Sequence, residues 1–195
     1  MSNKISIGLD LSINSTGVCV NMNNTQYFYI ITSKMTKKGI KLYNDMSNKI
    51  CNIILYDKVD HKGLEYSQKE LAKTINYYTI SNHIIDIIKI HSTIDDEIEC
   101  YIEGVSYGSI GSAALVDLVG LNFVVRTKLI ENNYKFTIVS PTENKRDAVG
   151  NGQATKDLMV YSFLQLHPQF SDFNKVTKID DIADAYFLSV RGECL

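Results

Sequence analysis

Four acidic residues occupy positions from which a folded chain could bring their carboxylates together. Asp10 lies near the end of one short apolar run and Glu103 ends another. Asp181 and Asp184 are three residues apart, so in a helix they share one face. We call this set the carboxylate cluster: Asp10, Glu103, Asp181 and Asp184.

Clustered carboxylates repel one another unless cations lie between them, and Mg²⁺ prefers oxygen ligands. Two such ions can activate a water molecule and stabilise the leaving oxygen in phosphodiester hydrolysis. The cluster therefore predicts a site for two Mg²⁺ ions, for which Mn²⁺ could substitute. Each acid also has an ordinary structural explanation, as a turn residue after a strand or as a cap at a helix start. Asp184 fits that explanation least well, because Ala183, Ala185 and Phe187 make its surroundings apolar.

The first elements that must position these acids are strands. Alternating apolar and β-branched residues predict strands over 4–11, 16–22 and 25–32. Asn23 and Asn24 form the link between the last two, and Asn tolerates the positive φ of a tight hairpin turn. The chain therefore opens with a three-stranded antiparallel meander that has Asp10 near the end of its first strand.

The pattern is less regular between residues 33 and 98. Residues 35–41 (MTKKGIK) are expected to form a basic loop, and residues 51–56 (CNIILY) fit either a strand or a helix. Residues 66–92 have apolar side chains at helical spacing, among them Leu71 and Ile75.

Strand and helix signals alternate over the remaining half of the chain. We expect strands at 99–103 and 134–139 and helices at 112–131, 154–166 and from about Asp180 to Val190. Ser140-Pro141-Thr142-Glu143 has the form of a capping box that starts a further short helix. This order predicts an α/β ribonuclease H-like fold with a mixed five-stranded sheet, three strands antiparallel and then parallel, flanked by helices. We expect a single domain over 1–195 with a divergent segment at 33–98.

Composition narrows the class of protein only slightly. The formal net charge of −2 argues mildly against a nucleic-acid binder, although bound cations reverse the local sign of an acidic site. The four cysteines lack metal-binding spacing and are expected to be reduced thiols. No signal peptide or membrane span is recognisable. We therefore expect a protein that is not secreted and has no membrane partner. It would be cytoplasmic, or at a nuclear or viral replication site in a eukaryotic host.

Four segments, in order along the chain, resemble the motifs of the RuvC-like Holliday junction resolvases, in particular those of bacteriophages and large DNA viruses. The segments are IGLDLSINSTGVCV (7–20), YIEGVSYGSIGSAAL (101–115), SPTENKRDAVGNGQATKDLM (140–159) and DDIADA (180–185). The resemblance implies that the carboxylate cluster ligates the metal ions. Asp180 is an alternative to Asp181, because the register is ambiguous by one residue.

The resemblance also implies roles for residues outside the cluster. Lys145 and Lys156 match two basic positions of the third motif, so both are candidates for DNA contact and Lys156 for catalysis as well. Arg146 is a further DNA-binding candidate. Family members from bacteria carry an aromatic residue three positions after the Glu, where this chain has Ser106. Tyr107 follows, and it could stack on a base or pack under its loop.

The activity implied is structure-selective cleavage of four-way DNA junctions by a homodimer, whose two-fold symmetry suits a junction. Residues Val116, Gly120, Phe123 and Val124 are candidates for the dimer contact, although they could instead pack under the 66–92 helix. A related nuclease acting on flaps or other branched DNA, and a junction-binding protein without activity, are the alternatives. The first motif also resembles the phosphate motif of actin-like ATPases, but this chain is too short for their two domains.

Overall fold

The centre of the molecule is a six-stranded mixed sheet. The structure is a computed structural model that describes residues 3–46, 49–105, 113–177 and 179–191. The strand order is β4-β3-β2-β1-β5-β6. The strands are β1 (Lys4–Asp10), β2 (Ser15–Met22), β3 (Thr25–Thr32), β4 (Asn52–Leu55), β5 (Glu97–Glu103) and β6 (Lys135–Val139).

The first three strands form the predicted antiparallel meander. β1 pairs with β2, and β2 pairs with β3. Asn23 and Asn24 connect β2 to β3 with φ values of 52° and 62°. Two consecutive left-handed residues are typical of a tight hairpin turn whose twist matches that of the strands. The local sequence was sufficient to predict this part of the fold.

The prediction of a five-stranded sheet was wrong, because the ambiguous run at 51–56 adds a sixth strand. β4 lies parallel to β3 at the edge of the sheet, with Ile53 beside Ile30 and Ile54 beside Ile31. A run of four residues is too short for its periodicity to separate strand from helix. The free edge of β3 resolves this ambiguity by offering backbone partners.

The basic loop predicted at 35–41 was also wrong. Residues Lys37–Asp45 form helix α1, which begins after Thr36. The Thr36 hydroxyl accepts a hydrogen bond from the Gly39 backbone N–H at 3.0 Å. A side-chain cap of this kind satisfies one of the unpaired N–H groups at a helix start.

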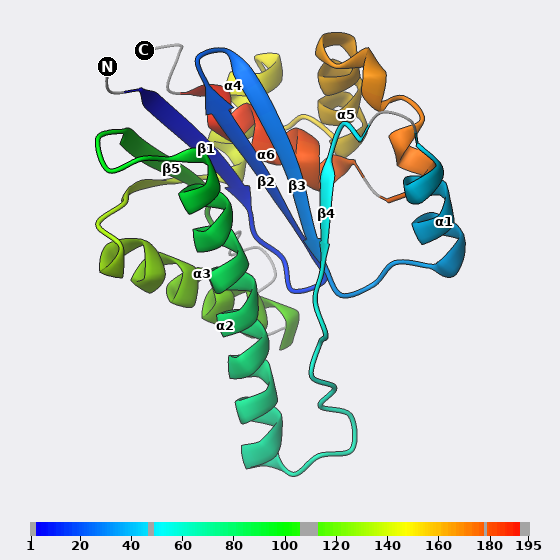
Figure 1. Cartoon of the computed structure of the whole chain (residues 1–195), viewed down its shortest axis with the longest axis vertical. Coiled ribbons are helices and arrows are strands. Elements are labelled where there is room, and N and C mark those ends of the chain that lie inside the picture. Colours follow the sequence, from blue (N-terminus) through cyan, green and yellow to red (C-terminus); the bar gives the residue numbers. More distant parts are fainter. Residues whose placement is uncertain (1–2, 47–48, 106–112, 178, 192–195) are drawn as a thin grey trace.

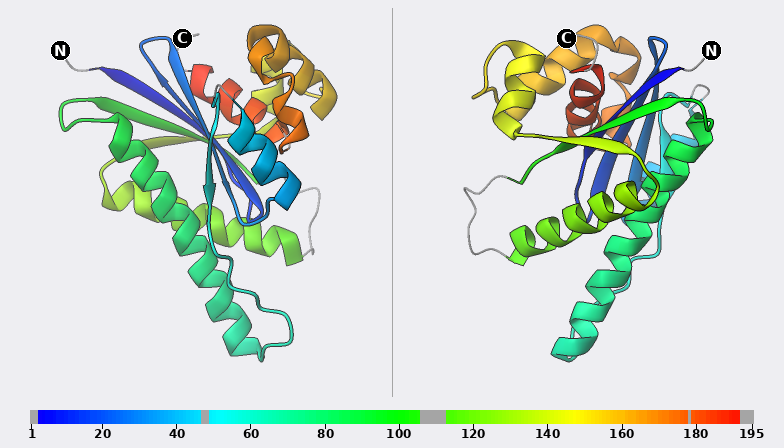
Figure 2. Two further views of the ribbon diagram at one scale, coloured as in Figure 1. Left: turned by 45° about the vertical axis from the view of Figure 1, so that its right-hand side comes forward. Right: turned by 90° about the vertical axis from the view of Figure 1, so that its left-hand side faces the viewer.

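Helices cover both faces of the sheet (Figures 1 and 2). One face carries α2 and α3, which pack against each other, and α6 packs on β1 and β2 from the other face. The remaining helices are α2 (Tyr66–His91), α3 (Ala113–Glu131), α4 (Pro141–Val149), α5 (Lys156–Leu166) and α6 (Asp180–Val190), with short 3-10 turns at Pro168–Phe170 and Phe173–Lys175.

Each face of the sheet has its own apolar core. Ile5, Ile7 and Leu9 of β1 pack toward α2 and α3. Phe28 and Ile30 of β3 belong to the second core, which lies under α5 and α6. Because side chains alternate along a strand, two opposite faces can be apolar at once. Helix α2 therefore packs on one face of the sheet, and helices α5 and α6 pack on the opposite face.

The N-terminal half of α2 projects beyond the sheet, as Figure 1 shows. Leu71 and Ile75, which have helical spacing in the sequence, are exposed there. Ile84 and Ile88, further along the same helix, are fully buried. The apolar pattern therefore predicted the helix correctly but did not show which half of it enters the core.

Three cysteines, Cys19, Cys51 and Cys100, are free and buried, as expected for reduced thiols. Cys194 lies outside the described residues. Within the same described ranges, no helix combines the length and the apolar character needed to cross a membrane.

Candidate metal and DNA site

The parallel pairing of β1 and β5 brings the first two acids to one end of the sheet. Leu9 lies beside Ile102, and Asp10 and Glu103 are the next residues on their strands. Both carboxylates are partly buried. Adjacent parallel strands that end together present their last side chains to the same space, so Asp10 and Glu103 become neighbours.

Two glycines allow α6 to bring the other two acids to the same place. A Cβ atom at Gly17 would collide with the backbone carbonyl of Asp181, and one at Gly8 would collide with that of Ala185. Gly17 is the partner of Asp10 in the β1–β2 ladder. The first turns of α6 therefore lie directly against the strands, beside Asp10.

The electrostatics of Asp10 indicate which charged side chains lie near it. Burial raises the pKa of Asp10 well above its ordinary value, and the charges of Glu103, Asp181 and Asp184 raise it further. The ammonium group of Lys156 opposes this effect. Glu103, Asp181 and Asp184 therefore lie near enough for their charges to act on Asp10.

Glu103 and Asp184 have raised pKa values as well. Burial is the largest cause for Glu103, opposed by a hydrogen bond from Asn144 and by the charges of Lys156 and Lys145. For Asp184, burial and then Glu103 raise the pKa to about 7. Burial, joined at Asp184 by the charge of Glu103, thus outweighs the effect of the nearby lysines on these two pKa values.

Lys156 lies at the start of α5 and reaches the start of α6. Its ammonium group is 3.0 Å from Oδ2 of Asp180. Burial lowers the pKa of Lys156, but this hydrogen bond and the charges of Asp180, Asp184 and Asp10 raise it overall. Lys156 therefore stays charged beside the cluster.

The same contacts separate the roles of the two adjacent aspartates. Asp180 pairs with Lys156, whereas Asp181 contributes to the raised pKa of Asp10. Asp181 is thus the one that acts on Asp10, but both aspartates raise the pKa of Asp184, so the choice between Asp181 and Asp180 as a ligand stays a prediction.

Helix α4 contributes two of the predicted basic residues and one residue that the sequence did not single out. Lys145 is partly buried and its charge acts on Glu103. Arg146 is exposed, and its charge acts on Glu143. Asn144 is buried between Glu103 and α6. Its position in the middle of an unremarkable polar run gave no signal in the sequence.

The donor set fits Mg²⁺ chemically, because four carboxylates supply only hard oxygen ligands. In their present positions, no group of three or more His, Cys, Asp or Glu side chains in the described part of the chain converges tightly enough to hold an ion. The carboxylates are nevertheless near enough to raise the pKa of Asp10. Ligation by the cluster therefore requires these side chains to turn toward one another.

Two recesses lie beside the residues of the cluster. One, of about 510 Å³, begins at Gly104, directly after Glu103, and is lined further by Phe123 and Arg126 of α3. The other, of about 280 Å³, lies along the loop 11–14 that follows Asp10. Lys58 lines this second recess, and its ammonium group is 3.1 Å from the side-chain oxygen of Asn14. Lys58 comes from the divergent segment, which had no recognisable motif.

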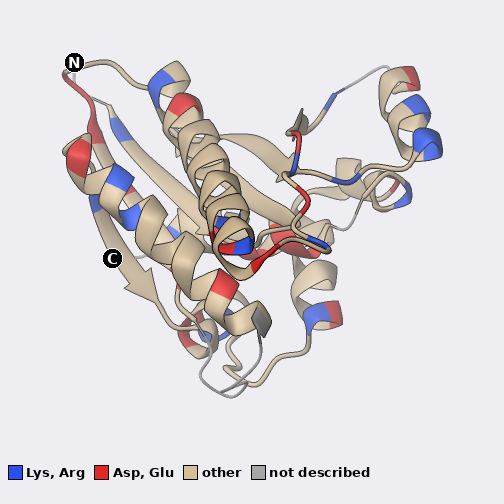
Figure 3. Ribbon diagram, turned by 90° about the horizontal axis from the view of Figure 1, so that it is seen from below, with Lys and Arg blue, Asp and Glu red and all other residues tan. Residues whose placement is uncertain are grey.

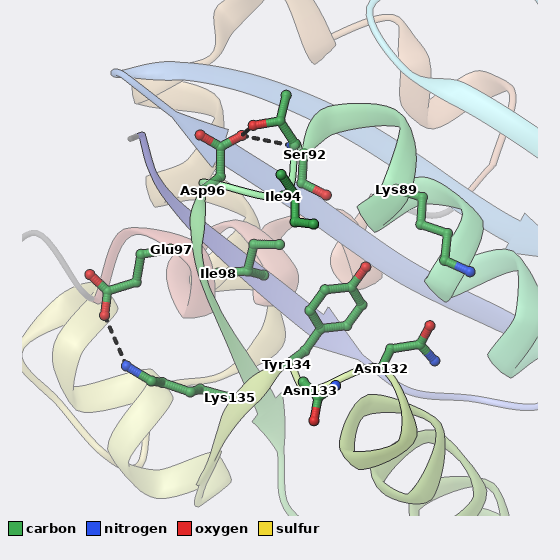
Figure 4. Close-up of a pocket in the computed structure, with 11 residues that line it drawn as sticks. Lys89, Ser92, Ile94, Asp96, Glu97, Ile98, Asn132, Asn133, Tyr134 and Lys135 are labelled. Carbon is green, nitrogen blue, oxygen red and sulfur yellow. Dashed lines mark hydrogen bonds and ion pairs between the residues drawn. The ribbon is translucent and has the colours of Figure 1, made fainter. Parts of the chain in front are cut away.

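A third recess lies away from the cluster, at the start of β5 (Figure 4). Its acids have partners: Glu97 is 3.0 Å from Lys135, and Asp96 accepts hydrogen bonds from Thr93. This recess therefore lacks the uncompensated carboxylates of the candidate site. Lys and Arg are interspersed with Asp and Glu over the face of the molecule seen in Figure 3, consistent with the small net charge.

The residue proposed to stack on a base cannot be placed. Tyr107 and Ser106 lie outside the described residues, so base stacking by Tyr107 stays a prediction.

The four residues considered for a dimer contact lie on different sides of α3. Gly120 faces Tyr77 of α2, and Val124 packs against the apolar core under α2 and α3. Only Val116 and Phe123 are exposed. The inward placement of the other two was the alternative that the sequence left open.

The comparisons with known proteins identify the fold. No family model matches the chain, and the comparison with curated proteins gives no match. RuvC from Thermus thermophilus matches with a TM-score of 0.54 and 10% identity, over 95% of this chain and 90% of that one. The same protein in complex with a Holliday junction substrate matches with a TM-score of 0.54 and 12% identity, over 97% and 91%. At this identity the likeness shows a ribonuclease H-like fold and nothing about activity.

A third structure, the yeast mitochondrial Holliday junction resolvase Ydc2, has a TM-score of 0.47 and 14% identity, over 96% of this chain and 76% of that one. None of these three is a bacteriophage or viral protein. The narrower resemblance to viral members therefore stays a prediction.

Proposed function

We propose that this chain is a metal-dependent endodeoxyribonuclease that cleaves four-way DNA junctions as a homodimer. The observation that carries the proposal is that four carboxylates from β1, β5 and α6 lie near one another in a ribonuclease H-like fold. Mutually repelling, partly buried carboxylates weaken a fold unless they serve a cationic ligand. A two-ion hydrolase gives this arrangement a chemical purpose.

In this proposal, Asp10, Glu103, Asp181 and Asp184 are the ligands of two Mg²⁺ or Mn²⁺ ions. When bound, the ions supply water activation and neutralisation of charge on the phosphate. The protein's part is to fix the four acids on rigid strands and on a helix packed against them. Preorganisation of this kind avoids reorientation of charged groups during the reaction.

Lys156 is the proposed catalytic cation. It is charged, lies beside Asp10 and Asp184, and is exposed enough to meet a phosphate. Lys145 lies on the side of Glu103, and we propose that it binds DNA. Arg146 and Tyr107 are proposed as more peripheral DNA contacts. Phosphate contacts of these kinds make binding dependent on salt.

The proposed substrate is branched DNA. The RuvC structure of similar fold contains a Holliday junction substrate, and in this chain two recesses are lined by residues that follow Glu103 and Asp10. A strand that crosses the cluster would have room beside Gly104 and beside the loop 11–14. A homodimer would present two such sites to the two opposed strands of a junction.

The decisive experiment is cleavage of a labelled synthetic four-way junction, with linear duplex and a Y-shaped fork as parallel substrates. The wild-type protein is compared with Asp10→Asn, which keeps the shape of the side chain and removes its charge. Asp172→Asn is the matched control, because this exposed aspartate is outside the carboxylate cluster and pairs with Lys175, three residues along the chain. Reactions contain Mg²⁺, Mn²⁺ or chelator.

We expect paired, symmetric cuts in the junction that disappear in chelator and in Asp10→Asn and persist in Asp172→Asn. Metal-dependent cuts in the fork or duplex as well would support a metal-dependent nuclease and overturn the proposed selectivity for four-way junctions. Tight junction binding without cuts in any metal would instead make the chain a binding protein. An Asp10→Asn variant as active as the wild type would refute the metal site.

A further inference from the structure

A buried amide joins two elements of the candidate site. Asn144 of α4 is only 2% exposed. Its side-chain N–H₂ group donates to Oε2 of Glu103 at 3.4 Å and to the backbone carbonyl of Asp184 at 3.3 Å. Asparagine is seldom this buried, and a buried polar group is costly unless it is hydrogen-bonded. Both of its donors are directed to the carboxylate cluster.

The chemistry of the amide suits this place. Its two N–H donors can serve two acceptors at once. One acceptor is a carboxylate on β5 and the other is main chain of α6 at a cluster residue. The two bonds therefore tie the Glu103 side chain to the helix that carries Asp181 and Asp184. The bond uses a single oxygen of Glu103, so the second can serve a cation.

Helix α4 is itself fixed, which makes Asn144 a rigid support. Its N-terminus is closed by the capping box of Ser140 and Glu143. At the far end of α6, Nε of Arg191 lies 3.1 Å from Asp147, and its Nη2 lies 3.7 Å from Glu143. The two helices are thus joined at two levels, by Arg191 at one and by Asn144 at the other.

We propose that Asn144 is a positioning residue that orients Glu103 relative to α6, so that Glu103 and Asp184 can ligate the same divalent cation. This inference rests on the proposed function. Groups that hydrogen-bond to metal ligands fix their orientation, and their loss typically lowers metal affinity by about 10–100-fold. A packing role alone would require only the volume of the side chain.

The test is Mn²⁺ binding to the purified full chain without DNA, measured by electron paramagnetic resonance of the free ion. Asn144→Leu keeps the volume and removes both donors, and Asn144→Ala removes the donors without the risk of overpacking. Asn76→Leu is the matched control. Asn76 is also 2% exposed, but within the described residues its amide hydrogen-bonds only to the backbone of Val59. Thermal unfolding of each variant is recorded in parallel.

We expect the Mn²⁺ dissociation constant to rise about tenfold or more in both Asn144 variants and to stay near the wild-type value in Asn76→Leu. In junction cleavage, the Mg²⁺ concentration for half-maximal rate should rise in the same variants. The rate at saturating Mg²⁺ should fall much less, because the ligands themselves are intact.

Wild-type Mn²⁺ affinity in a folded Asn144→Ala or Asn144→Leu protein would overturn the inference and leave the proposed function standing. Equal weakening in Asn76→Leu would also overturn it, because the effect would then follow from general loss of stability. A wild-type protein that binds no Mn²⁺ and cleaves nothing would overturn the proposed function itself, and the inference with it.

Discussion

Asp184 has a pKa of about 7, because burial and the charge of Glu103 both disfavour its ionised form. An ordinary aspartate loses its proton near 3.8. The folded protein therefore keeps a proton on Asp184 that the unfolded chain releases between these values. Raising the pH across this window favours unfolding.

We therefore predict that the metal-free protein loses stability as the pH rises from about 4 to about 7, through the pKa window of Asp184. The Asp184→Asn variant should lose less stability over this pH range, and at pH 8 its melting temperature should be higher than that of the wild type. The measurement is thermal unfolding in chelator over this range. Asp172→Asn is the control, because its pairing with Lys175 lowers the pKa of Asp172 and removes it from this window. Parallel curves for wild type and Asp184→Asn would contradict the assignment.

Lys156 offers a second prediction at the scale of a residue. Its charge lies beside Asp10 and Asp184, where negative charge on the scissile phosphate would need stabilisation during the proposed cleavage. Lys156→Ala should slow single-turnover junction cleavage about a hundredfold, the loss typical of one stabilising group. Junction binding in Ca²⁺ should weaken only a few-fold.

The matched control for Lys156 is Lys175→Ala. Lys175 is similarly exposed and also pairs with an aspartate, Asp172, but it lies in a 3-10 turn and not at the start of α5. It should retain wild-type cleavage. Equal losses of binding and cleavage in Lys156→Ala would make Lys156 a binding contact only.

At the scale of elements, the position of α6 decides whether the acids can meet. Gly8 and Gly17 have no side chains to separate α6 from β1 and β2. Because α6 touches the strands through its backbone, Asp181 reaches the end of β1. A single methyl group at either glycine would push the helix outward.

We predict that Gly17→Ala destabilises the protein by about 1–3 kcal/mol, as overpacking in a core typically does. It should also weaken metal-dependent cleavage beyond any change in stability. The measurements are denaturant unfolding and the Mg²⁺ dependence of cleavage. Gly63→Ala is the control, since Gly63 has a φ of 79° and open space around it. That variant should lose some stability through backbone strain and keep its Mg²⁺ dependence. A fully active Gly17→Ala protein would refute the role given to this contact.

At the scale of the whole molecule, one apolar stripe on α3 is left uncovered by the described part of the chain. Val116, Phe123 and Ile130 recur every seven residues and are 63%, 61% and 64% exposed. Seven residues are close to two turns, so these side chains lie along one line on the helix. The opposite side of α3 packs on α2 through Gly120 and Tyr77. The stripe is therefore the part of α3 that a second copy could cover.

We predict that the wild-type protein sediments as a dimer and that Phe123→Asp shifts it to monomer, because a buried unpaired charge opposes association. Analytical ultracentrifugation over a range of concentrations checks this. Leu166→Asp, at an exposed apolar position of α5, is the control and should leave the dimer intact. A monomeric wild type, or a dimeric Phe123→Asp, would contradict the use of this stripe.

Local patterns in the sequence predicted much of the architecture. Alternation over β1, β2 and β3, the Asn23-Asn24 turn and the Ser140–Glu143 capping box are all interactions between near neighbours. Such features depend on residues a few positions apart, so the sequence alone specifies them. The order of strands and helices then indicated the ribonuclease H-like fold and the acids that its strand ends could bring together.

The tertiary structure decided what depends on contacts between distant segments. β4 became a strand because the edge of β3 is available, and α6 reaches Asp10 because two glycines elsewhere in the chain leave space. Asn144 and Lys58 gained their neighbours in the same way. Local sequence patterns cannot predict these contacts, because each contact depends on how elements that are far apart in the sequence pack together.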